Sequence, residues 1–244
     1  MIFGKRRIFF LSVIIIVSLL FYFLGRKQAG EREMRYNAQI SQMKDSVMVE
    51  KVLAEQDGTE MRKIALTFDD GPHPYYTEQL LDGLKERNVC ATFFVTGEHA
   101  ELYPDIIARM EEEGHLIGNH TYSHMQLKAG SLDAFKEELV KTNEIISGIT
   151  GEEVLFVRPP YGTWEKSLEA ELNMFPVLWT IDPLDWCSSS SDGITRKVLT
   201  KAKENSIILM HDSYPSTVTA ALSIVDELQK QGYEFVTVDE ILFD

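Results

Sequence analysis

Cysteine is scarce in this chain: only Cys90 and Cys187 occur among 244 residues. Two cysteines are too few to build a fold that disulfides hold together. The strand pattern described below places Cys90 at the start of one strand and Cys187 beyond the end of another. These two positions lie at opposite ends of the domain, whereas a disulfide requires Cα atoms within about 7 Å of each other. We therefore expect two free thiols.

Basic residues are also few, with 24 Lys and Arg against 38 Asp and Glu, which gives a formal net charge of −14. Proteins that bind nucleic acids need clustered Lys and Arg to displace the counterions of the phosphates. The sequence contains no basic stripe of this kind. We therefore expect no nucleic-acid partner.

Long apolar runs are absent except for one, Ile8–Leu24, which is uncharged and bounded by Lys5–Arg7 and by Arg26 and Lys27. About 17–25 residues suffice for a helix to cross a bilayer. A cleaved signal peptide would have a shorter apolar core followed by small residues. We predict that residues 1–27 form an uncleaved signal-anchor. Basic residues lie on both sides of the run, but the cluster before it favours a single-pass protein whose catalytic domain is extracellular.

Residues 28–60 are polar and contain no proline and only two glycines. Their scattered apolar residues indicate a weakly amphipathic helix, so we interpret this segment as a stalk or linker. No heptad pattern persists long enough to predict a coiled coil. We expect a monomer, with a dimer formed through the stalk as the alternative.

Residues 61–244 alternate short apolar segments with longer helical patterns, which is typical of βα units and a parallel sheet. The length suits a single catalytic domain. We predict an α/β fold, a distorted (β/α) barrel of about seven parallel strands. The predicted strands are Ile64–Phe68, Ala91–Val95, Leu116–Gly118, Leu155–Val157, Val177–Thr180, Ile207–Met210 and Phe235–Thr237. The predicted helices lie near Thr77–Arg87, Pro104–Glu113, Leu132–Ser147, Trp164–Leu172, Gly193–Glu204 and Val218–Lys230.

Chemically reactive side chains follow the ends of five of these strands. Active sites of barrels and of open parallel sheets form at the carboxyl ends of the strands. Polar residues with purely structural roles would not be expected to gather at one end of the sheet. These residues are Asp69 and Asp70, His120 and His124, Arg158, Asp182 to Trp186, and His211. His115 lies at the beginning of a strand instead, and we interpret it as structural.

Two histidines four residues apart, His120 and His124, are a weak signal alone, because surface or capping histidines share this spacing. Adjacent aspartates such as Asp69 and Asp70 can also simply cap a helix or a turn. Two carboxylates at a buried rim repel each other unless a cation or a proton separates them. One aspartate with two histidines forms a mixed oxygen and nitrogen donor set, which suits a catalytic zinc or a similar ion.

Five motifs in this order resemble the polysaccharide deacetylases, a family also known as the NodB-homology domain or carbohydrate esterase family 4. The resemblance extends from about Arg62 to the C-terminus. The motifs are Thr67-Phe-Asp-Asp-Gly-Pro72, His120-Thr-Tyr-Ser-His124, Arg158-Pro-Pro-Tyr-Gly162, Asp182-Pro-Leu-Asp-Trp186 and Ile208-Leu-Met-His-Asp212.

The resemblance implies a role for each matching residue. It makes Asp70, His120 and His124 the ligands of one divalent metal, with zinc expected and cobalt, nickel or manganese as alternatives. It makes Asp69 the catalytic base and His211 the general acid. It further implies that Arg158 holds the base and that Asp185 is the acidic partner that tunes the arginine and the histidine. Tyr161 would offer its backbone N–H to the oxyanion. Apart from the resemblance, Trp186 lies at the predicted rim with Trp164 and Tyr161, where it suits a sugar-stacking surface at least as well as a place in the core.

The activity that the resemblance implies is hydrolysis of N-acetyl groups on a polysaccharide. For an anchored protein we expect a cell-surface polymer, peptidoglycan or another N-acetylglucosamine polymer. An esterase that removes O-acetyl groups from a polymer such as xylan is the alternative within enzymology. A noncatalytic glycan-binding module is the alternative from another class of protein.

Overall fold

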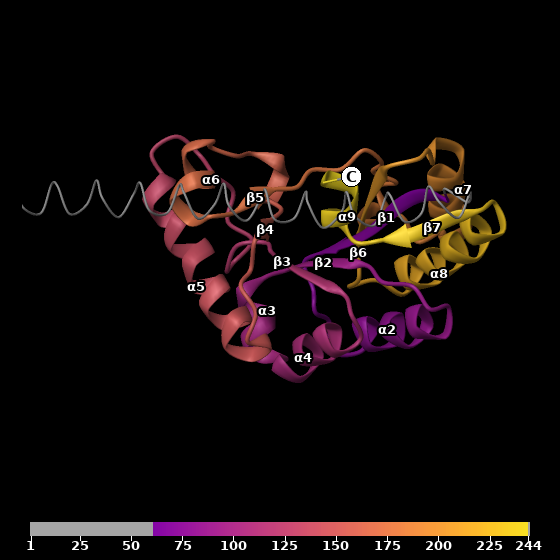
Figure 1. Cartoon of the computed structure of the whole chain (residues 1–244), viewed down its shortest axis with the longest axis horizontal. Helices are drawn as coiled ribbons and strands as arrows, with labels where there is room; N and C mark the ends of the chain where they lie inside the picture. The colour runs from indigo at the N-terminus through magenta and orange to yellow at the C-terminus, as the bar shows by residue number, and fades with distance from the viewer. Residues whose placement is uncertain (1–60, 244) are drawn as a thin grey trace, which may run out of the picture.

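The computed structural model describes residues 61–243, so the predicted anchor 1–27 and stalk 28–60 lie outside the described residues. Within residues 61–243, no helix combines the length and the apolar composition needed to cross a membrane. The described residues contain a sheet covered by helices, as Figure 1 shows.

All neighbouring strands of the seven-stranded sheet run parallel, in the order β5-β4-β3-β2-β1-β6. The first part of β1 also pairs with β7, from Arg62 opposite Tyr233 to Ala65 opposite Val236. A parallel α/β sheet of about seven strands is therefore confirmed. The strands are β1 (Arg62–Asp69), β2 (Thr92–Val95), β3 (Leu116–Asn119), β4 (Phe156–Val157), β5 (Phe175–Pro176), β6 (Ser206–His211) and β7 (Tyr233–Val236).

The sheet curls towards a barrel, and within residues 61–243 a single isolated bridge joins its two edges. Beyond β5 the chain crosses the gap, and Ile181 forms an isolated parallel bridge with Ile208 of β6. The N–H of Leu209 donates to the carbonyl of Ile181 at 2.9 Å. The barrel is thus incompletely closed between β5 and β6.

The strand predicted at Val177–Thr180 is wrong, because the regular strand lies two residues earlier, at Phe175–Pro176. The carbonyls of Val177 and Leu178 accept hydrogen bonds from the guanidinium of Arg158, at 3.2 and 3.4 Å. These carbonyls bind a side chain instead of a neighbouring strand, so a regular ladder does not continue through them.

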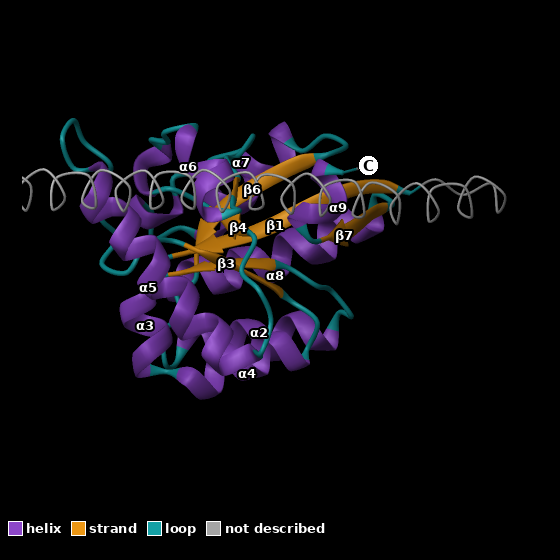
Figure 2. Cartoon of the chain, turned by 60° about the vertical axis from the view of Figure 1, so that its left-hand side comes forward, coloured by secondary structure: helices purple, strands orange, loops and turns teal. Residues whose placement is uncertain are grey.

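The helices surround the outside of the curled sheet (Figures 1 and 2). The helix predicted from Trp164 begins only at Ser167, and α3 and α9 were not predicted. The helices are α2 (Tyr76–Glu86), α3 (Gly97–Leu102), α4 (Pro104–Glu112), α5 (Leu132–Thr150), α6 (Ser167–Leu172), α7 (Ser191–Lys201), α8 (Pro215–Lys230) and α9 (Val238–Leu242).

Successive residues of β1 face opposite sides of the sheet, because side chains alternate along a strand. Ile64, Leu66 and Phe68 pack in the large core beneath the helices. Ala65 belongs to a second apolar cluster, together with Phe94, Phe156, Phe175 and Val238. Thr67 and Asp69 follow Ala65 on its side of β1, so the alternation aims Asp69 into the mouth of the barrel.

Both cysteines are free thiols, as expected. Cys90 is partly buried and Cys187 is exposed.

Candidate active site

A cavity of about 360 Å³ opens at the carboxyl ends of the strands. The proposed metal ligands, the base Asp69 and the acid His211 come from three strand ends and meet at this cavity, whereas Arg158 and Asp185 are buried and do not line it. The cavity is lined by Asp69, Asp70, His120, His124, Pro159, Tyr161, Trp179, Asp182, Trp186, Leu209, His211 and Tyr214.

Three side-chain atoms converge at one point of the cavity wall. Nε2 of His120 and Nε2 of His124 each lie 3.4 Å from the same oxygen, Oδ1 of Asp70. This oxygen is buried and has no hydrogen-bond partner in the described part of the chain. Ligand atoms about 2.0–2.1 Å from a tetrahedral zinc are separated by about 3.3 Å, so the spacing fits a metal site. These three residues also form the one candidate metal cluster found within residues 61–243.

The two histidines lie on a loop after β3, and not on a helix. Thr121 and His124 both adopt positive φ angles, 62° and 57°, which bring the two rings to the same side of the loop. Their ring centroids are 5.0 Å apart. Glu138 of α5 accepts hydrogen bonds from the backbone N–H and the hydroxyl of Ser123, which anchors the loop between the histidines.

A hydrogen bond from Nδ1 of His120 to the carbonyl oxygen of Arg158, at 2.5 Å, fixes the tautomer of this histidine. The carbonyl can only accept, so Nδ1 carries the proton and Nε2 keeps a free lone pair. Second partners of this kind are typical of metal-binding histidines. Burial lowers the pKa of His124, which favours the neutral imidazole that a metal requires.

Asp70 also has an electrostatic environment that suits a ligand. Burial alone would raise its pKa, but the neighbouring imidazoles of His120, His211 and His124 lower the pKa to about 2. Asp70 therefore stays a carboxylate at neutral pH. Its backbone carbonyl accepts a hydrogen bond from Nδ1 of His99 at 2.7 Å, so His99 supports the backbone of this residue.

Asp69 is held by Arg158, which is completely buried. One guanidinium nitrogen donates to Oδ1 of Asp69 at 2.8 Å and to the hydroxyl of Thr67 at 2.6 Å. The guanidinium carbon lies 4.2 Å from the centre of the Phe94 ring, so the cation also has an aromatic partner. Burial lowers the pKa of Arg158, and Asp69 opposes that effect.

His211 forms a second pair with Asp185. Its Nδ1 donates to Oδ1 of Asp185 at 2.9 Å, and its backbone N–H donates to Oδ2 at 2.7 Å. Burial disfavours the charged imidazole, but Asp185 outweighs burial, with help from Asp69 and Asp70, and raises the pKa of His211 to about 9. His211 is thus a charged imidazolium at neutral pH.

Asp185 contacts the histidine but not the arginine. Its Oδ2 also accepts from the hydroxyl of Thr217 at 2.8 Å. Arg158 binds Asp69, Thr67 and two backbone carbonyls instead. Asp185 was expected to contact both the arginine and the histidine. Within residues 61–243, it contacts His211 and makes no contact with Arg158.

Tyr161 and Trp186 form the open rim of the cavity, with exposures of 66% and 54%. Tyr161 has a φ of 60° and packs edge-on against His124, with 5.1 Å between the ring centroids. Exposed aromatic faces at the mouth of a cavity suit a carbohydrate ligand, which combines an apolar face with polar edges.

Sequence reasoning missed several residues that line or support the site. The hydroxyl of Thr67 donates to the carbonyl of Ile208 at 2.7 Å while it accepts from Arg158, so it ties the arginine to β6. Tyr214 follows the motif that contains His211, and its position just after a strand was the available signal. Trp179 follows β5 but lies inside the segment predicted as a strand, so the sequence pattern did not place it at the cavity.

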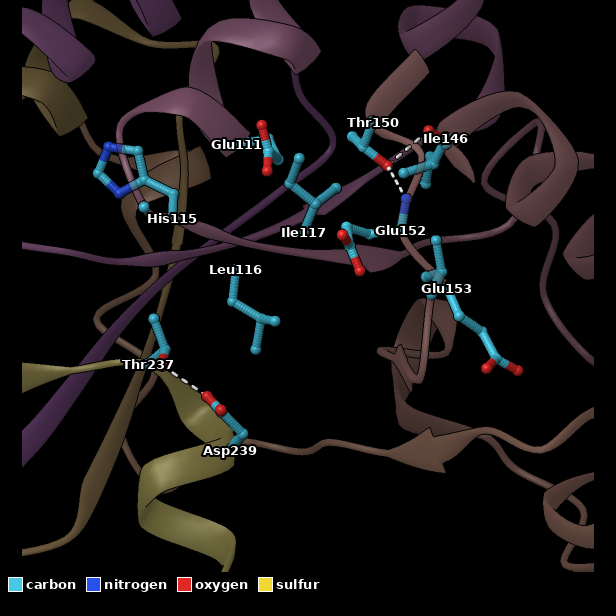
Figure 3. Close-up of a pocket in the computed structure, with 12 residues that line it drawn as sticks. Glu111, His115, Leu116, Ile117, Ile146, Thr150, Glu152, Glu153, Thr237 and Asp239 are labelled. Atoms are coloured by element: carbon cyan, nitrogen blue, oxygen red, sulfur yellow. Dashed lines mark hydrogen bonds between the residues drawn. The ribbon is translucent and has the colours of Figure 1, made fainter. Parts of the chain in front are cut away.

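A second cavity, of about 390 Å³, lies at the amino ends of β3 and β4 and is lined by Glu111, Glu152, Glu153 and Asp239 among others. Figure 3 shows His115 at one edge of this cavity. Nδ1 of His115 accepts the N–H of Ala91 at 3.1 Å. Burial lowers the pKa of His115 to about 4, so it is neutral, as expected of a structural histidine.

Comparisons with known proteins agree on one family. Residues 56–177, half of the chain, match the family model for polysaccharide deacetylases. A peptidoglycan-N-acetylglucosamine deacetylase of Bacillus cereus is 42% identical over 183 residues, which cover 72% of this chain and 66% of the relative. The chain thus spans slightly less than two thirds of that relative.

One further relative and the chain of one solved structure are covered almost completely. A chitooligosaccharide deacetylase of Rhizobium leguminosarum bv. trifolii is 38% identical, with 78% of this chain and 97% of the relative aligned. The solved structure of the peptidoglycan deacetylase PdaC from Bacillus subtilis is 39% identical with a TM-score of 0.72, over 75% of this chain and 91% of that chain.

Proposed function

The chain belongs to the polysaccharide deacetylase family, and we propose that it hydrolyses the N-acetyl groups of a cell-wall polymer with the aid of a divalent metal. The observation that carries this proposal is the convergence of Asp70, His120 and His124 beside two ionised pairs, Asp69 with Arg158 and His211 with Asp185.

The metal would be held by Oδ1 of Asp70 and Nε2 of His120 and His124. A divalent cation there supplies a Lewis acid that polarises the acetyl carbonyl and makes a water molecule more acidic. Zinc suits the donor set best, and cobalt, nickel or manganese can replace it in a site of this kind.

Asp69 acts as the base in the proposed mechanism. It lies beside the ligands, with Oδ2 3.8 Å from Nε2 of His120. Arg158 holds the other oxygen, so the free oxygen faces the cavity and can take a proton from the attacking water. The guanidinium of Arg158 fixes the orientation of Asp69 for that transfer.

His211 acts as the acid. An amine is a very poor leaving group unless it receives a proton as the C–N bond breaks. The pKa of about 9 means that His211 carries that proton at neutral pH, and Asp185 stabilises it until transfer. The backbone N–H of Tyr161 would donate to the developing oxyanion.

We propose peptidoglycan, or another polymer that contains N-acetylglucosamine, as the substrate. The names of the relatives support an N-acetylated glycan. The exposed rings of Tyr161 and Trp186 support a polymer that lies across an open rim. Deacetylation would convert neutral amides into amines that are protonated at neutral pH.

We also propose that residues 1–27 anchor the protein as a single-pass signal-anchor, that 28–60 form a stalk, and that 61–244 form the extracellular catalytic domain. The apolar run Ile8–Leu24 and its basic flanks support this arrangement. Cell fractionation with protease treatment of intact cells tests it. Protein released into the medium and lacking residues before Arg62 would contradict it.

The experiment that tests the activity is acetate release from peptidoglycan, chitooligosaccharides, poly-N-acetylglucosamine and acetylxylan. Release from the N-acetylated polymers that stops with a chelator and returns with zinc supports the proposal. Turnover of acetylxylan alone would identify an O-acetyl esterase, for which His211→Ala should matter less because an alkoxide leaves more easily than an amine anion. Glycan binding without acetate release under any metal would identify a noncatalytic module.

A further inference from the structure

Asp212 is a buried carboxyl group that the proposed chemistry does not use. It follows His211 after β6 and has no solvent exposure. Its Oδ2 accepts a hydrogen bond from the hydroxyl of Thr77 at 2.5 Å. Its Oδ1 has no hydrogen-bond partner within residues 61–243. A buried polar atom without a hydrogen-bond partner costs free energy. A different contact must therefore account for a carboxyl group at this position.

That contact is with Gly71, the residue after the proposed ligand Asp70. A Cβ atom added to Gly71 would lie 2.5 Å from both carboxyl oxygens of Asp212 and 2.8 Å from its Cγ. Real Cβ atoms do not approach other atoms so closely. The carboxyl group therefore fills the space that a side chain at position 71 would occupy, and the backbone of the turn rests on it.

The conformation of Asp70 needs such support. Its φ is 72°, in the left-handed region that residues with side chains rarely adopt, and surrounding contacts must hold it there. The carbonyl of Asp70 accepts from His99, and the carbonyl of Gly71 accepts from the N–H of Thr96 at 3.1 Å. Asp212 contacts the turn at Gly71, between the residue that carries the ligand and the residues that follow.

Thr77 connects the same carboxyl group to the far end of the turn. Its hydroxyl, which donates to Asp212, accepts the backbone N–H of His73 at 2.7 Å. Thr77 is itself completely buried and lies at the start of α2. One carboxyl group thus contacts the turn directly at Gly71 and indirectly at His73.

We propose that Asp212 is a positioning residue whose carboxyl group, through Gly71 and Thr77, holds the turn that presents Asp70 to the metal. The inference rests on the proposed function, because Asp70 is a metal ligand only in that account. Asp212 would act by shape and hydrogen bonding, so an isosteric side chain should replace it.

Binding of Co²⁺ to the full chain tests the proposal without reference to turnover. The readouts are the dissociation constant and the visible absorption spectrum of the bound Co²⁺, which reports its coordination. Asp212→Ala should weaken Co²⁺ binding about 10- to 100-fold and alter the spectrum, as loss of a supporting residue around a metal site typically does. Asp212→Asn should bind Co²⁺ with a dissociation constant within about threefold of the wild-type value. Asp226→Asn, at the exposed partner of Arg87, is the matched control and should change neither readout.

A double variant tests the contact itself. Gly71→Ala alone should weaken Co²⁺ binding, because the new methyl group collides with the carboxyl group. Adding Asp212→Ala removes the collision, so the double variant should bind Co²⁺ more tightly than Gly71→Ala alone. If Asp212→Ala does not fold by circular dichroism, Thr77→Val replaces it as the milder disruption and should weaken binding about 3- to 10-fold.

Three outcomes would overturn the proposal: a folded Asp212→Ala with wild-type affinity and spectrum, Asp212→Asn as weak as Asp212→Ala, or a double variant no better than Gly71→Ala. Where the alanine variant does not fold, wild-type affinity in Thr77→Val would overturn it too. These outcomes differ from failure of the proposed function, which would appear as a wild-type protein that binds neither Co²⁺ nor Zn²⁺.

Discussion

His211 and Asp185 are joined twice, once through the imidazole Nδ1 at 2.9 Å and once through the backbone N–H of His211 at 2.7 Å. The hydrogen bond from Nδ1 stabilises the imidazolium. The hydrogen bond from the backbone N–H fixes the position of the His211 backbone, from which the ring extends. Asp185 is itself almost completely buried. In the proposed mechanism, the pair would therefore deliver a proton from a defined position.

Asp185→Asn should lower the pKa of His211 from about 9 towards 6.5, because the carboxylate contributes the hydrogen bond and the nearest charge. The acid form is then lost at lower pH, and kcat/KM should fall about tenfold per pH unit above about 6.5. The wild type should keep its activity up to about pH 9. A pH–rate profile measures both, and an unchanged alkaline limb in the variant would show that His211 is not the acid.

The same pair makes stability depend on pH. The folded pKa of His211 is raised above 6.5, so the pair stabilises the folded state fully below pH 6.5, and that stabilisation is lost as pH rises through about 9. Asp185→Asn should therefore lose more stability at pH 6 than at pH 10. Urea unfolding at both values checks this, and an equal loss at both pH values would contradict the pair's role.

Arg158→Met should destabilise the domain by about 3–5 kcal/mol, since it leaves the carboxylate of Asp69 buried without its partner. Arg158→Lys should lose less stability. A single ammonium cannot reproduce the bonds to Asp69, Thr67 and the carbonyls after β5, so activity should still fall. Thermal unfolding with acetate release separates the two effects, and a fully active Arg158→Lys would contradict the positioning of Asp69.

Metal content should stay constant above pH 6.5 and fall below it. The pKa of Asp70 is about 2 and the pKa of His124 lies below 6.5, so protons compete for the site only in acid. His124→Ala should lose the metal at neutral pH. Elemental analysis after dialysis against chelator-treated buffer checks both, with His115→Ala as a control outside the site. Full metal content in His124→Ala would contradict the ligand assignment.

Trp186→Ala should raise KM for a polymer about 3- to 10-fold and leave kcat nearly unchanged, because its exposed ring would contact sugar and not the reacting atoms. For a short acetylated substrate that does not reach the rim, KM should change little. A fall in kcat with constant KM would place Trp186 in the chemistry instead.

Much of this architecture could be predicted because β1 and β6 are apolar runs and parallel strands align their carboxyl ends. That rule alone brings Asp69 and His211 to one rim. The interval Val177–Thr180 could not be predicted, because its geometry depends on the guanidinium of Arg158, which follows a different strand, β4. Thr67 was missed for a related reason: its hydroxyl acts only through Arg158 and the carbonyl of Ile208.

Acetate release from peptidoglycan by the zinc-loaded protein, compared with Asp69→Asn, tests the central claim most directly. The account predicts metal-dependent release by the wild type and a loss of at least about 100-fold in the variant, which should still bind zinc because Asp69 is not a ligand. Asp69→Asn that retains wild-type activity would contradict the account, as would a zinc-loaded wild type that releases no acetate.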